Sequence, residues 1–240
     1  MAAQATSSGM HGLAVLGGCF NPVHYGHVRL ALALHEKLAS VLSDITFMPS
    51  AHPPHKPEAH MLPFPLRAEL VRKAIAPYPW MHCSEMEAER DKPSYTWDTL
   101  GLLKKELASG QELFFILGTD DYAQLPTWHN GLRLIERATL LVISRGDCAD
   151  GTFERLTESM WPGAVTAAPL SSDGRCMTTE TSRILFQPVP PVPISSSLVR
   201  RRWLDGLPIG DLVPEAVEKE LFRQTKTVLK HWTESYSYSI

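Results

Sequence analysis

The feature that most constrains this chain is a string at residues 17–27, which reads Gly-Gly-Cys-Phe-Asn-Pro-Val-His-Tyr-Gly-His. It follows an apolar run at residues 13–16 and leads into a helical pattern over residues 28–40. This order predicts a strand, a glycine turn and a helix. A glycine pair lets the backbone approach a phosphate without a Cβ in the way, and a helix start offers N–H groups and the positive end of a dipole. We therefore expect this turn to bind phosphate.

Two histidines in the string, His24 and His27, are expected to carry the chemistry. They stand three positions apart at the head of the predicted helix, so their side chains project the same way. Imidazole N–H groups can stabilise a phosphate on which charge grows during a reaction. Taken alone, Gly17 and Gly18 are equally compatible with a tight turn, and it is the whole string that favours a site.

A second set of phosphate-binding groups is predicted at residues 194–200, which read Ile-Ser-Ser-Ser-Leu-Val-Arg. The hydroxyls of Ser195, Ser196 and Ser197 stand at a predicted helix start, and Arg200 follows about one turn later. Backbone, hydroxyl and guanidinium donors of this kind can hold a triphosphate.

Together the two motifs resemble those of the nucleotidyltransferase superfamily, whose members move a nucleotidyl group from a nucleoside triphosphate. The superfamily signatures read Gly-Gly-x-Phe-x-Pro-x-His-x-Gly-His and Ile-Ser-Ser-Thr-x-x-Arg. This chain departs from them at Cys19, where Thr or Ser is usual, and at Ser197, where Thr is usual. The change at Cys19 removes a hydroxyl donor near the phosphates, whereas the change at Ser197 removes only a methyl group.

Composition limits the class of protein. The chain has 240 residues, of which 44% are hydrophobic and 20% charged, enough for a large buried core. A net charge of −3 without a long basic block argues against a duplex nucleic-acid binder. Four cysteines without a CxxC pair suggest reduced thiols and no structural zinc. Neither a signal peptide nor a membrane span is recognisable, so we expect a cytoplasmic protein that binds no membrane.

Strand and helix patterns alternate along the chain, which predicts an α/β, doubly wound and mainly parallel sheet with a helical C-terminal part. Strands are predicted at residues 13–16, 45–48, 81–86, 113–117, 138–144 and 184–189. Helices are predicted at residues 28–40, 66–75, 97–108 and 132–137, after residue 197, and as one amphipathic helix over 214–232. Residues 51–65 read as a proline-rich loop, and 147–181 as irregular with a short helix near 153–160.

The predicted layout is one domain over residues 12–232, with residues 194–232 as its helical part. Residues 1–11 are expected to form a flexible lead-in and residues 233–240 a flexible tail. Two predicted turns, after residues 13–16 and after residues 113–117, follow strands, and the C-terminal edge of such a sheet carries the ligand crevice.

Three further stretches resemble the bacterial nicotinate-nucleotide adenylyltransferases within that superfamily. They are residues 53–56 (Pro-Pro-His-Lys), residues 93–96 (Pro-Ser-Tyr-Thr), and residues 118–120 (Gly-Thr-Asp) taken with 125–128 (Leu-Pro-Thr-Trp). The resemblance spans most of the chain and is weakest over residues 147–181. It implies a Rossmann-like fold.

This resemblance implies adenylyl transfer from ATP to nicotinate mononucleotide, giving nicotinate adenine dinucleotide and pyrophosphate, as a step of NAD synthesis. The implied catalytic residues are His24, His27 and Arg200. The implied ATP-binding residues are Gly17, Gly18, Cys19, Phe20, Gly118, Asp120, Ser195, Ser196 and Ser197. The implied mononucleotide-binding residues are Thr96, Trp128 and His129, with His55 and Lys56 as further candidate phosphate contacts.

The physical chemistry of the ligands agrees with these assignments. Trp128 can stack on a pyridine ring, and backbone N–H groups near Thr96 and His129 suit the nicotinate carboxylate better than an amide. Magnesium is expected to bind through the substrate phosphates, because no carboxylate cage is evident. From the residues alone, Trp128 is also compatible with a core position, Asp120 with a turn cap and Thr96 with a place beside a helix cap.

Three other functions are weighed. A pantetheine-phosphate adenylyltransferase would not be expected to show the Pro-Ser-Tyr-Thr and Leu-Pro-Thr-Trp stretches. A silent nucleotide sensor would bind ATP without turnover, and the presence of His24, His27 and Arg200 argues against it. A tRNA-charging enzyme is set aside because the chain lacks a Lys-rich second signature. The sequence leaves the oligomeric state open, with a homo-oligomer as one option.

Overall fold

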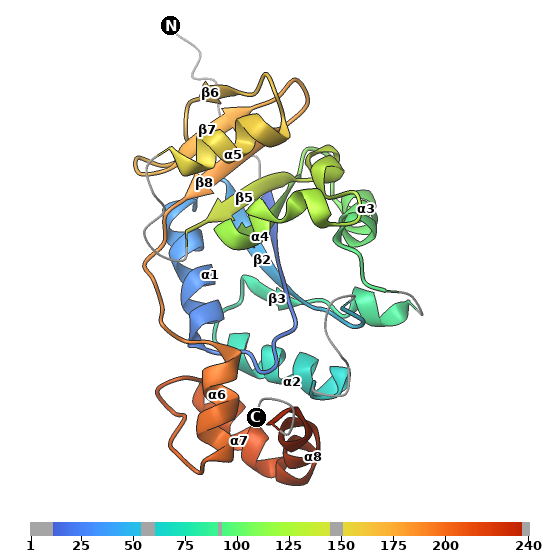
Figure 1. The fold of residues 1–240 in the computed structure, drawn as a ribbon, viewed down its shortest axis with the longest axis vertical. Coiled ribbons are helices and arrows are strands. Elements are labelled where there is room, and N and C mark those ends of the chain that lie inside the picture. The colour runs from blue at the N-terminus through green and yellow to red at the C-terminus, as the bar shows by residue number, and fades with distance from the viewer. Residues whose placement is uncertain (1–11, 54–60, 91–92, 145–150, 237–240) are drawn as a thin grey trace, which may run out of the picture.

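The structure, a computed structural model, describes residues 12–53, 61–90, 93–144 and 151–236 (Figure 1). His55 and Lys56 lie outside these ranges. Across the described residues, no helix has the length and apolar character needed to cross a membrane.

A single sheet forms the centre of the described structure, with strand order β3-β2-β1-β4-β5-β8-β7-β6. Neighbours from β3 to β8 pair in parallel. Beyond β8 the sheet continues antiparallel with β7 (Arg175–Thr178) and β6 (Val165–Ala167). The parallel strands are β1 (Gly12–Gly18), β2 (Leu42–Pro49), β3 (Met81–Cys83), β4 (Glu112–Gly118), β5 (Thr139–Ile143) and β8 (Arg183–Gln187). The mainly parallel, doubly wound fold class is confirmed.

Helices connect the strands and cover both faces of the sheet. The α-helices that follow β1 to β5 are α1 (Tyr25–Lys37), α2 (Phe64–Ile75), α3 (Thr96–Glu106), α4 (Thr119–Ala123) and α5 (Thr152–Met160). Short 3₁₀ helices are η2 (Met86–Glu89), η3 (Leu125–Thr127) and η4 (Gly131–Glu136). The helical pattern predicted at residues 132–137 is therefore a 3₁₀ helix.

Side-chain alternation along the strands produces two cores, one on each face. On β4, Phe114 and Ile116 join the core beneath α1 and α2, whereas Leu113, Phe115 and Leu117 join the core beneath α3, α5 and η4. A strand buried on both faces needs a continuous apolar run, because successive side chains point to opposite faces. This is why residues 113–117 were recognisable as a central strand.

The strand order reverses direction at β1, which pairs with β2 on one side and β4 on the other. In open α/β sheets the crevice at such a reversal, outside the carboxyl ends of the strands, is where ligands bind. The turn at Gly18 and the β4–α4 junction at Gly118 lie at these ends. Sheet topology therefore brings together two segments that the sequence separates widely.

The C-terminal part consists of α6 (Ser196–Leu204), α7 (Glu215–Arg223) and α8 (Thr225–Tyr236). These helices lie together beyond α2, at the opposite end of the molecule from β6 and β7 (Figure 1). The single helix predicted over residues 214–232 was wrong, because the chain turns at Gln224. The turn lets α7 pack on α2 while α8 packs on α6. The last helix also continues past residue 232 to Tyr236.

Residues 147–181 were expected to be irregular apart from a short helix. The described part of that stretch contains α5, as expected, and two strands that were missed, β6 (Val165–Ala167) and β7 (Arg175–Thr178). Both strands are short, and Val165 is 61% exposed, so they lack the apolar pattern that predicts a strand. The strand predicted at residues 81–86 also ends earlier, at Cys83, and η2 follows it.

Replacement of Gly12 by alanine should destabilise the sheet. A Cβ built on Gly12 lies 2.4 Å from the Phe114 ring and 2.7 Å from the carbonyl oxygen of Val41. Because the Val41 oxygen is backbone, the contact cannot relax by a rotamer change, and Gly12→Ala should lower the free energy of unfolding by about 1–3 kcal/mol. Urea denaturation followed by circular dichroism measures this change.

The matched control is Gly101→Ala in α3. A Cβ there lies 3.5 Å from the Arg137 guanidinium, which is an ordinary contact. Alanine is also the better helix former, so this variant should be unchanged or more stable by up to about 1 kcal/mol. Equal stability of the two variants would contradict the close packing of β1 on β4.

Candidate active site

A cavity of about 690 Å³ opens at the carboxyl ends of β1 and β4. Its walls come from the β1–α1 turn, the start of α1, the start of α3, the η3–η4 junction and the segment that leads into α6. The predicted site residues in its lining are Gly17, Gly18, Cys19, Phe20, His24, His27, Thr96, Trp128, Ser195 and Ser196. The fold thus brings the first predicted phosphate motif, the start of the second, and two of the three predicted mononucleotide residues, Thr96 and Trp128, around one space.

Other predicted residues lie beside this cavity rather than in its lining. Gly118 is buried at the end of β4, and Asp120 is exposed in the first turn of α4, where the neighbouring Asp121 lines the cavity instead. His129 stacks on Tyr95, with ring centroids 4.4 Å apart.

Ser197 and Arg200 also lie outside the lining, one helical turn apart on α6. The Arg200 guanidinium donates to the Ser197 hydroxyl at 3.0 Å and to the Asn21 carbonyl at 2.8 Å. Arg200 is therefore oriented by the β1–α1 turn itself.

His24 and His27 are held in one orientation by the start of α1. Nδ1 of His24 accepts from the Gly26 N–H at 3.1 Å, and Nδ1 of His27 accepts from the His24 N–H at 3.2 Å. The two imidazoles thus act as a reciprocal capping box at the helix N-terminus, a part usually played by Ser, Thr and Glu. Their ring centroids are 3.8 Å apart.

These hydrogen bonds fix the tautomer of both rings. A neutral imidazole has one N–H donor and one acceptor nitrogen, and in His24 and His27 the acceptor is Nδ1. Nε2 therefore carries the proton. The cap converts each histidine into an oriented N–H donor in the wall of the cavity.

Gly26 is required by this arrangement. A Cβ at Gly26 would stand 2.8 Å from Cε1 and Nδ1 of the His24 ring and 3.3 Å from the Ile194 carbonyl oxygen. Any larger residue would displace the imidazole or the segment before α6. The glycine between the two histidines thus permits the close approach of His24 to the helix N-terminus.

The carbonyl groups of the β1–α1 turn are bound by side chains from α2 and α6. Arg67, on α2 and only 1% exposed, donates to the Cys19 carbonyl at 2.7 Å and to the Leu62 carbonyl at 2.9 Å. The Ser196 hydroxyl donates to the Pro22 carbonyl at 2.9 Å. Because the C=O and N–H of one peptide unit point in opposite directions, the Phe20 N–H is directed away from Arg67.

Phe20 has φ of +44°, the left-handed region that non-glycine residues seldom adopt. Its ring is 2% exposed and packs edge-on against His27 with centroids 4.9 Å apart. The turn therefore keeps an unfavourable backbone conformation that the surrounding contacts determine.

The opposite wall is built at the start of α3. The Glu87 carboxylate, 6% exposed, accepts from the Ala51 N–H at 3.3 Å and from the Thr99 hydroxyl at 2.9 Å. Ser94 and His52 exchange two hydrogen bonds, one from each backbone N–H. These contacts anchor the α3 N-terminus, which contains Thr96, to the loop after β2.

Trp128 is half-buried and packs edge-to-face on Phe115 of β4, with centroids 6.5 Å apart. It lines the cavity across from the start of α1. Gly131 lies three residues after Trp128 in the sequence. A Cβ at Gly131 would stand 1.9 Å from the Leu125 carbonyl oxygen, so the short η3–η4 turn that contains Trp128 needs glycine at this position.

Several contributors to the site were missed by sequence reasoning. Arg67 stands on the buried face of α2 with Leu70, Val71 and Ala74, and a charged residue at that spacing is a detectable signal. The proline-rich segment at residues 189–193 also lines the cavity, and its composition alone did not place it there.

Comparison with known proteins supplies independent information. Residues 15–202 match a family described as Cytidylyltransferase-like. A "Probable nicotinate-nucleotide adenylyltransferase" of Pseudomonas putida (strain GB-1) is 34% identical over 205 residues, covering 85% of this chain and 90% of that protein. A protein of the same name from Halorhodospira halophila is 38% identical over 209 residues, covering 87% and 92%.

The fold is also found in a solved structure. Plasmodium falciparum nicotinic acid mononucleotide adenylyltransferase, complexed with NaAD, superposes with a TM-score of 0.66 at 16% identity, covering 90% of this chain and 97% of that one. At this identity the similarity establishes the fold.

The tautomer of the paired histidines can be tested directly. At a pH where both rings are neutral, ¹⁵N NMR should show Nε2 protonated and Nδ1 unprotonated for His24 and His27. Gly26→Ala should disturb the His24 signals, because the new Cβ occupies ring space. A protonated Nδ1 in either neutral ring would contradict the capping geometry.

Proposed function

We propose that this chain, which belongs to the cytidylyltransferase-like family and to the nicotinate-nucleotide adenylyltransferases within it, joins the adenylyl group of ATP to nicotinate mononucleotide. The products are nicotinate adenine dinucleotide and pyrophosphate, and the reaction is a step of NAD synthesis. One observation carries the proposal: a single cavity has the paired histidines and the α6 start in one wall and Thr96 and Trp128 in another.

ATP is assigned to the part of the cavity between the starts of α1 and α6. The backbone of Gly17, Gly18, Cys19 and Phe20 would approach the phosphates, with the α1 dipole favouring their charge. Ser195 and Ser196 at the start of α6 also line the cavity, and the N-cap hydroxyl of Ser195 accepts from the Leu198 N–H at 3.2 Å. The further ATP contacts in this proposal are Ser196, Ser197, Gly118 and Asp120, the last to the ribose hydroxyls.

The reaction is an in-line attack. A phosphate oxygen of nicotinate mononucleotide forms a bond to the α-phosphorus of ATP, the bond from that phosphorus to the bridging oxygen breaks, and pyrophosphate leaves with the electron pair. No covalent enzyme intermediate is needed, so positioning and charge stabilisation dominate. His24 and His27 would donate their Nε2 protons in hydrogen bonds to the α-phosphate as its charge shifts.

Arg200 is assigned to the β- and γ-phosphates that leave. A guanidinium has five N–H donors in a rigid plane, and the contacts to Asn21 and Ser197 orient that plane. His55 and Lys56, outside the described residues, are retained as candidate phosphate contacts.

Nucleotidyltransferases of this kind generally use a divalent metal, and we propose that ATP binds as its magnesium complex. The described residues near the phosphate walls offer N–H and hydroxyl donors, which suit phosphate oxygens rather than a cation. No group of three or more His, Cys, Asp or Glu side chains suited to a metal occurs among the described residues. The metal would therefore be bound mainly by phosphates and water.

The mononucleotide is assigned to the wall formed by α3 and Trp128. The Trp128 ring would stack on the pyridine, and backbone N–H groups near Thr96 and His129 would bind the nicotinate carboxylate. The amide of nicotinamide in the same place would turn its NH₂ group toward backbone N–H donors. Because both groups are donors, neither would have a hydrogen-bond partner. Nicotinate should therefore be preferred to nicotinamide.

The decisive assay is pyrophosphate release from ATP and magnesium with three acceptors in parallel: nicotinate mononucleotide, nicotinamide mononucleotide and phosphopantetheine. The proposal predicts the fastest release with the nicotinate compound. Pyrophosphate release only with phosphopantetheine would mean that phosphopantetheine, and not nicotinate mononucleotide, is the acceptor. ATP binding without pyrophosphate release for any acceptor would mean that the protein is a nucleotide sensor.

Removal of the His27 imidazole should slow the chemical step. His27→Ala is expected to lower kcat by about 10²- to 10³-fold, because an oriented donor to the reacting phosphate is lost. The control is His35→Ala on the same helix, whose ring stacks on Trp80 and does not line the cavity. A folded His27→Ala enzyme with normal kcat would show that His27 has no role in the chemical step.

Removal of the Trp128 ring should instead affect acceptor binding. Trp128→Ala is expected to raise the KM for the mononucleotide about tenfold with a smaller effect on the KM for ATP, since stacking area is lost at one substrate only. Trp128→Phe should restore part of the affinity. The control is Trp80→Ala, which removes an equally half-buried ring that stacks on His35 and does not line the cavity. An unchanged mononucleotide KM would exclude stacking.

A further inference from the structure

The far C-terminal end of the described chain reaches the β1–α1 turn through one side chain. Trp232, on α8, is 0% exposed, and its indole Nε1 donates to Oδ1 of Asn21 at 3.3 Å. Asn21 is itself 7% exposed. Since neither group faces open solvent, water cannot readily replace this hydrogen bond.

Asn21 is a junction of three separate parts of the chain. Its Oδ1 also accepts from the Leu62 N–H at 3.1 Å, and its carbonyl accepts from Arg200 at 2.8 Å. Two N–H donors on one amide oxygen establish which way the Asn21 amide faces. The position of this residue is thus set by the segment before α2, by α6 and by α8.

The residues next to Asn21 line the cavity. Cys19 and Phe20 precede it, and His24 follows at the α1 N-cap. Phe20 is in the left-handed region, a conformation that persists only while its surroundings impose it. A change at Asn21 would therefore be transmitted to the peptide groups assigned to the phosphates.

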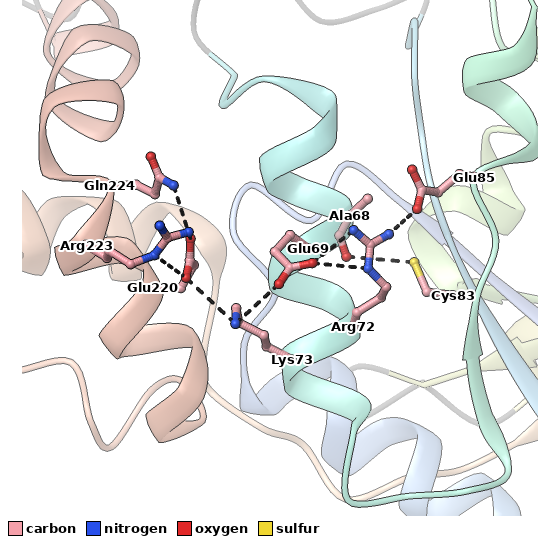
Figure 2. A network of polar contacts seen from close by, with 9 residues as sticks. All are labelled: Ala68, Glu69, Arg72, Lys73, Cys83, Glu85, Glu220, Arg223 and Gln224. Carbon is pink, nitrogen blue, oxygen red and sulfur yellow. Dashed lines mark hydrogen bonds and ion pairs between the residues drawn. The ribbon is translucent and has the colours of Figure 1, made fainter.

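The position of Trp232 is itself well defined. Its ring packs perpendicular to that of Trp203 on α6, with centroids 5.5 Å apart. α8 follows α7, and α7 is joined to α2 by the polar network of Figure 2. The indole is therefore supported by α6, and α8 is connected to α2 through α7.

Glu220 is the acceptor on the α7 side of that network (Figure 2). It accepts from Arg223 at 2.9 Å and from Gln224 at 3.2 Å, and lies 3.8 Å from the Lys73 ammonium of α2 (Figure 2). Lys73 also pairs with Glu69 at 3.2 Å. The hydrogen bond from Arg223 keeps the pKa of the Glu220 carboxyl below its ordinary value, so this side chain stays charged at neutral pH.

We propose that Trp232 is a positioning residue for adenylyl transfer. Its indole N–H holds the Asn21 amide, and through Asn21 it sets the turn that binds the phosphates and orients His24. The inference rests on the proposed function, and it assigns the C-terminal helices a part in the site that lies outside the cavity lining.

The test compares two substitutions that make the same chemical change. Trp232→Phe removes the indole N–H but keeps an aromatic ring. Trp203→Phe, the control, removes an indole N–H from the neighbouring ring, and within the described part of the chain the Trp203 nitrogen has no hydrogen-bond partner. Trp203 is 8% exposed and belongs to the same apolar cluster as Trp232, so both changes occur in similar surroundings.

Both variants lose ring area, but only Trp232→Phe also loses a buried hydrogen bond, so it should be the less stable of the two, and both are assayed well below their melting temperatures. The two variants should also differ in kinetics. Trp232→Phe is expected to lower kcat/KM for ATP by about three- to tenfold, the effect of one lost hydrogen bond, while Trp203→Phe stays within about twofold of the unchanged enzyme. The KM for nicotinate mononucleotide should change little in either. Equal kinetics for the two variants would overturn the proposal.

A second measurement does not depend on turnover. In ¹⁵N–¹H spectra without substrate, Trp232→Phe should shift the backbone N–H signals of Cys19 and Phe20, and Trp203→Phe should leave them in place. If the unchanged protein releases no pyrophosphate with any acceptor, the proposed function fails, and these spectra still test the coupling. If Trp232→Phe does not fold, the test can be made on the unchanged protein. On addition of a non-hydrolysable ATP analogue, the indole N–H signal of Trp232 should shift more than that of Trp203. Equal shifts would overturn the inference.

Discussion

The arrangement of the site depends on how the carbonyl groups of the β1–α1 turn are bound. Arg67 binds the Cys19 carbonyl and Arg200 the Asn21 carbonyl, both from outside the cavity. With these two carbonyl oxygens bound by guanidinium groups, the turn can present N–H groups and a helix start to an anion. The same turn leads into the cap that orients His24 and His27. The proposed phosphate site and the orientation of the two histidines thus have one structural origin.

The sheet explains why this turn meets its distant partners. β1 lies between β2 and β4, so the crevice at its carboxyl end is bounded by the loop after β2 on one side and the β4–α4 junction on the other. The segment after β8 then returns across the crevice and delivers the Ser195 cap to the neighbourhood of Pro22. An α/β scaffold with both faces covered provides the rigidity that in-line transfer needs.

Local chemistry was predictable from sequence, and long-range contacts were not. The glycine turn, the histidine pair and the α6 cap are encoded within a few residues each, so they were recognisable as patterns. Arg67 and Trp232 contact partners far away in the sequence. An arginine taken alone suggests a solvated cation, and a tryptophan taken alone suggests a ring in the core. The β6–β7 pair was missed because both strands are short and lack a recognisable apolar alternation: β7 is held by pairing with β8, and β6 by pairing with β7.

The most direct test is a crystal structure of the chain with a non-hydrolysable ATP analogue and nicotinate mononucleotide. The α-phosphate should lie within hydrogen-bond distance of Nε2 of both His24 and His27, with the pyridine against Trp128. A structure with the phosphates bound elsewhere, and the histidine pair facing no phosphate oxygen, would contradict this arrangement.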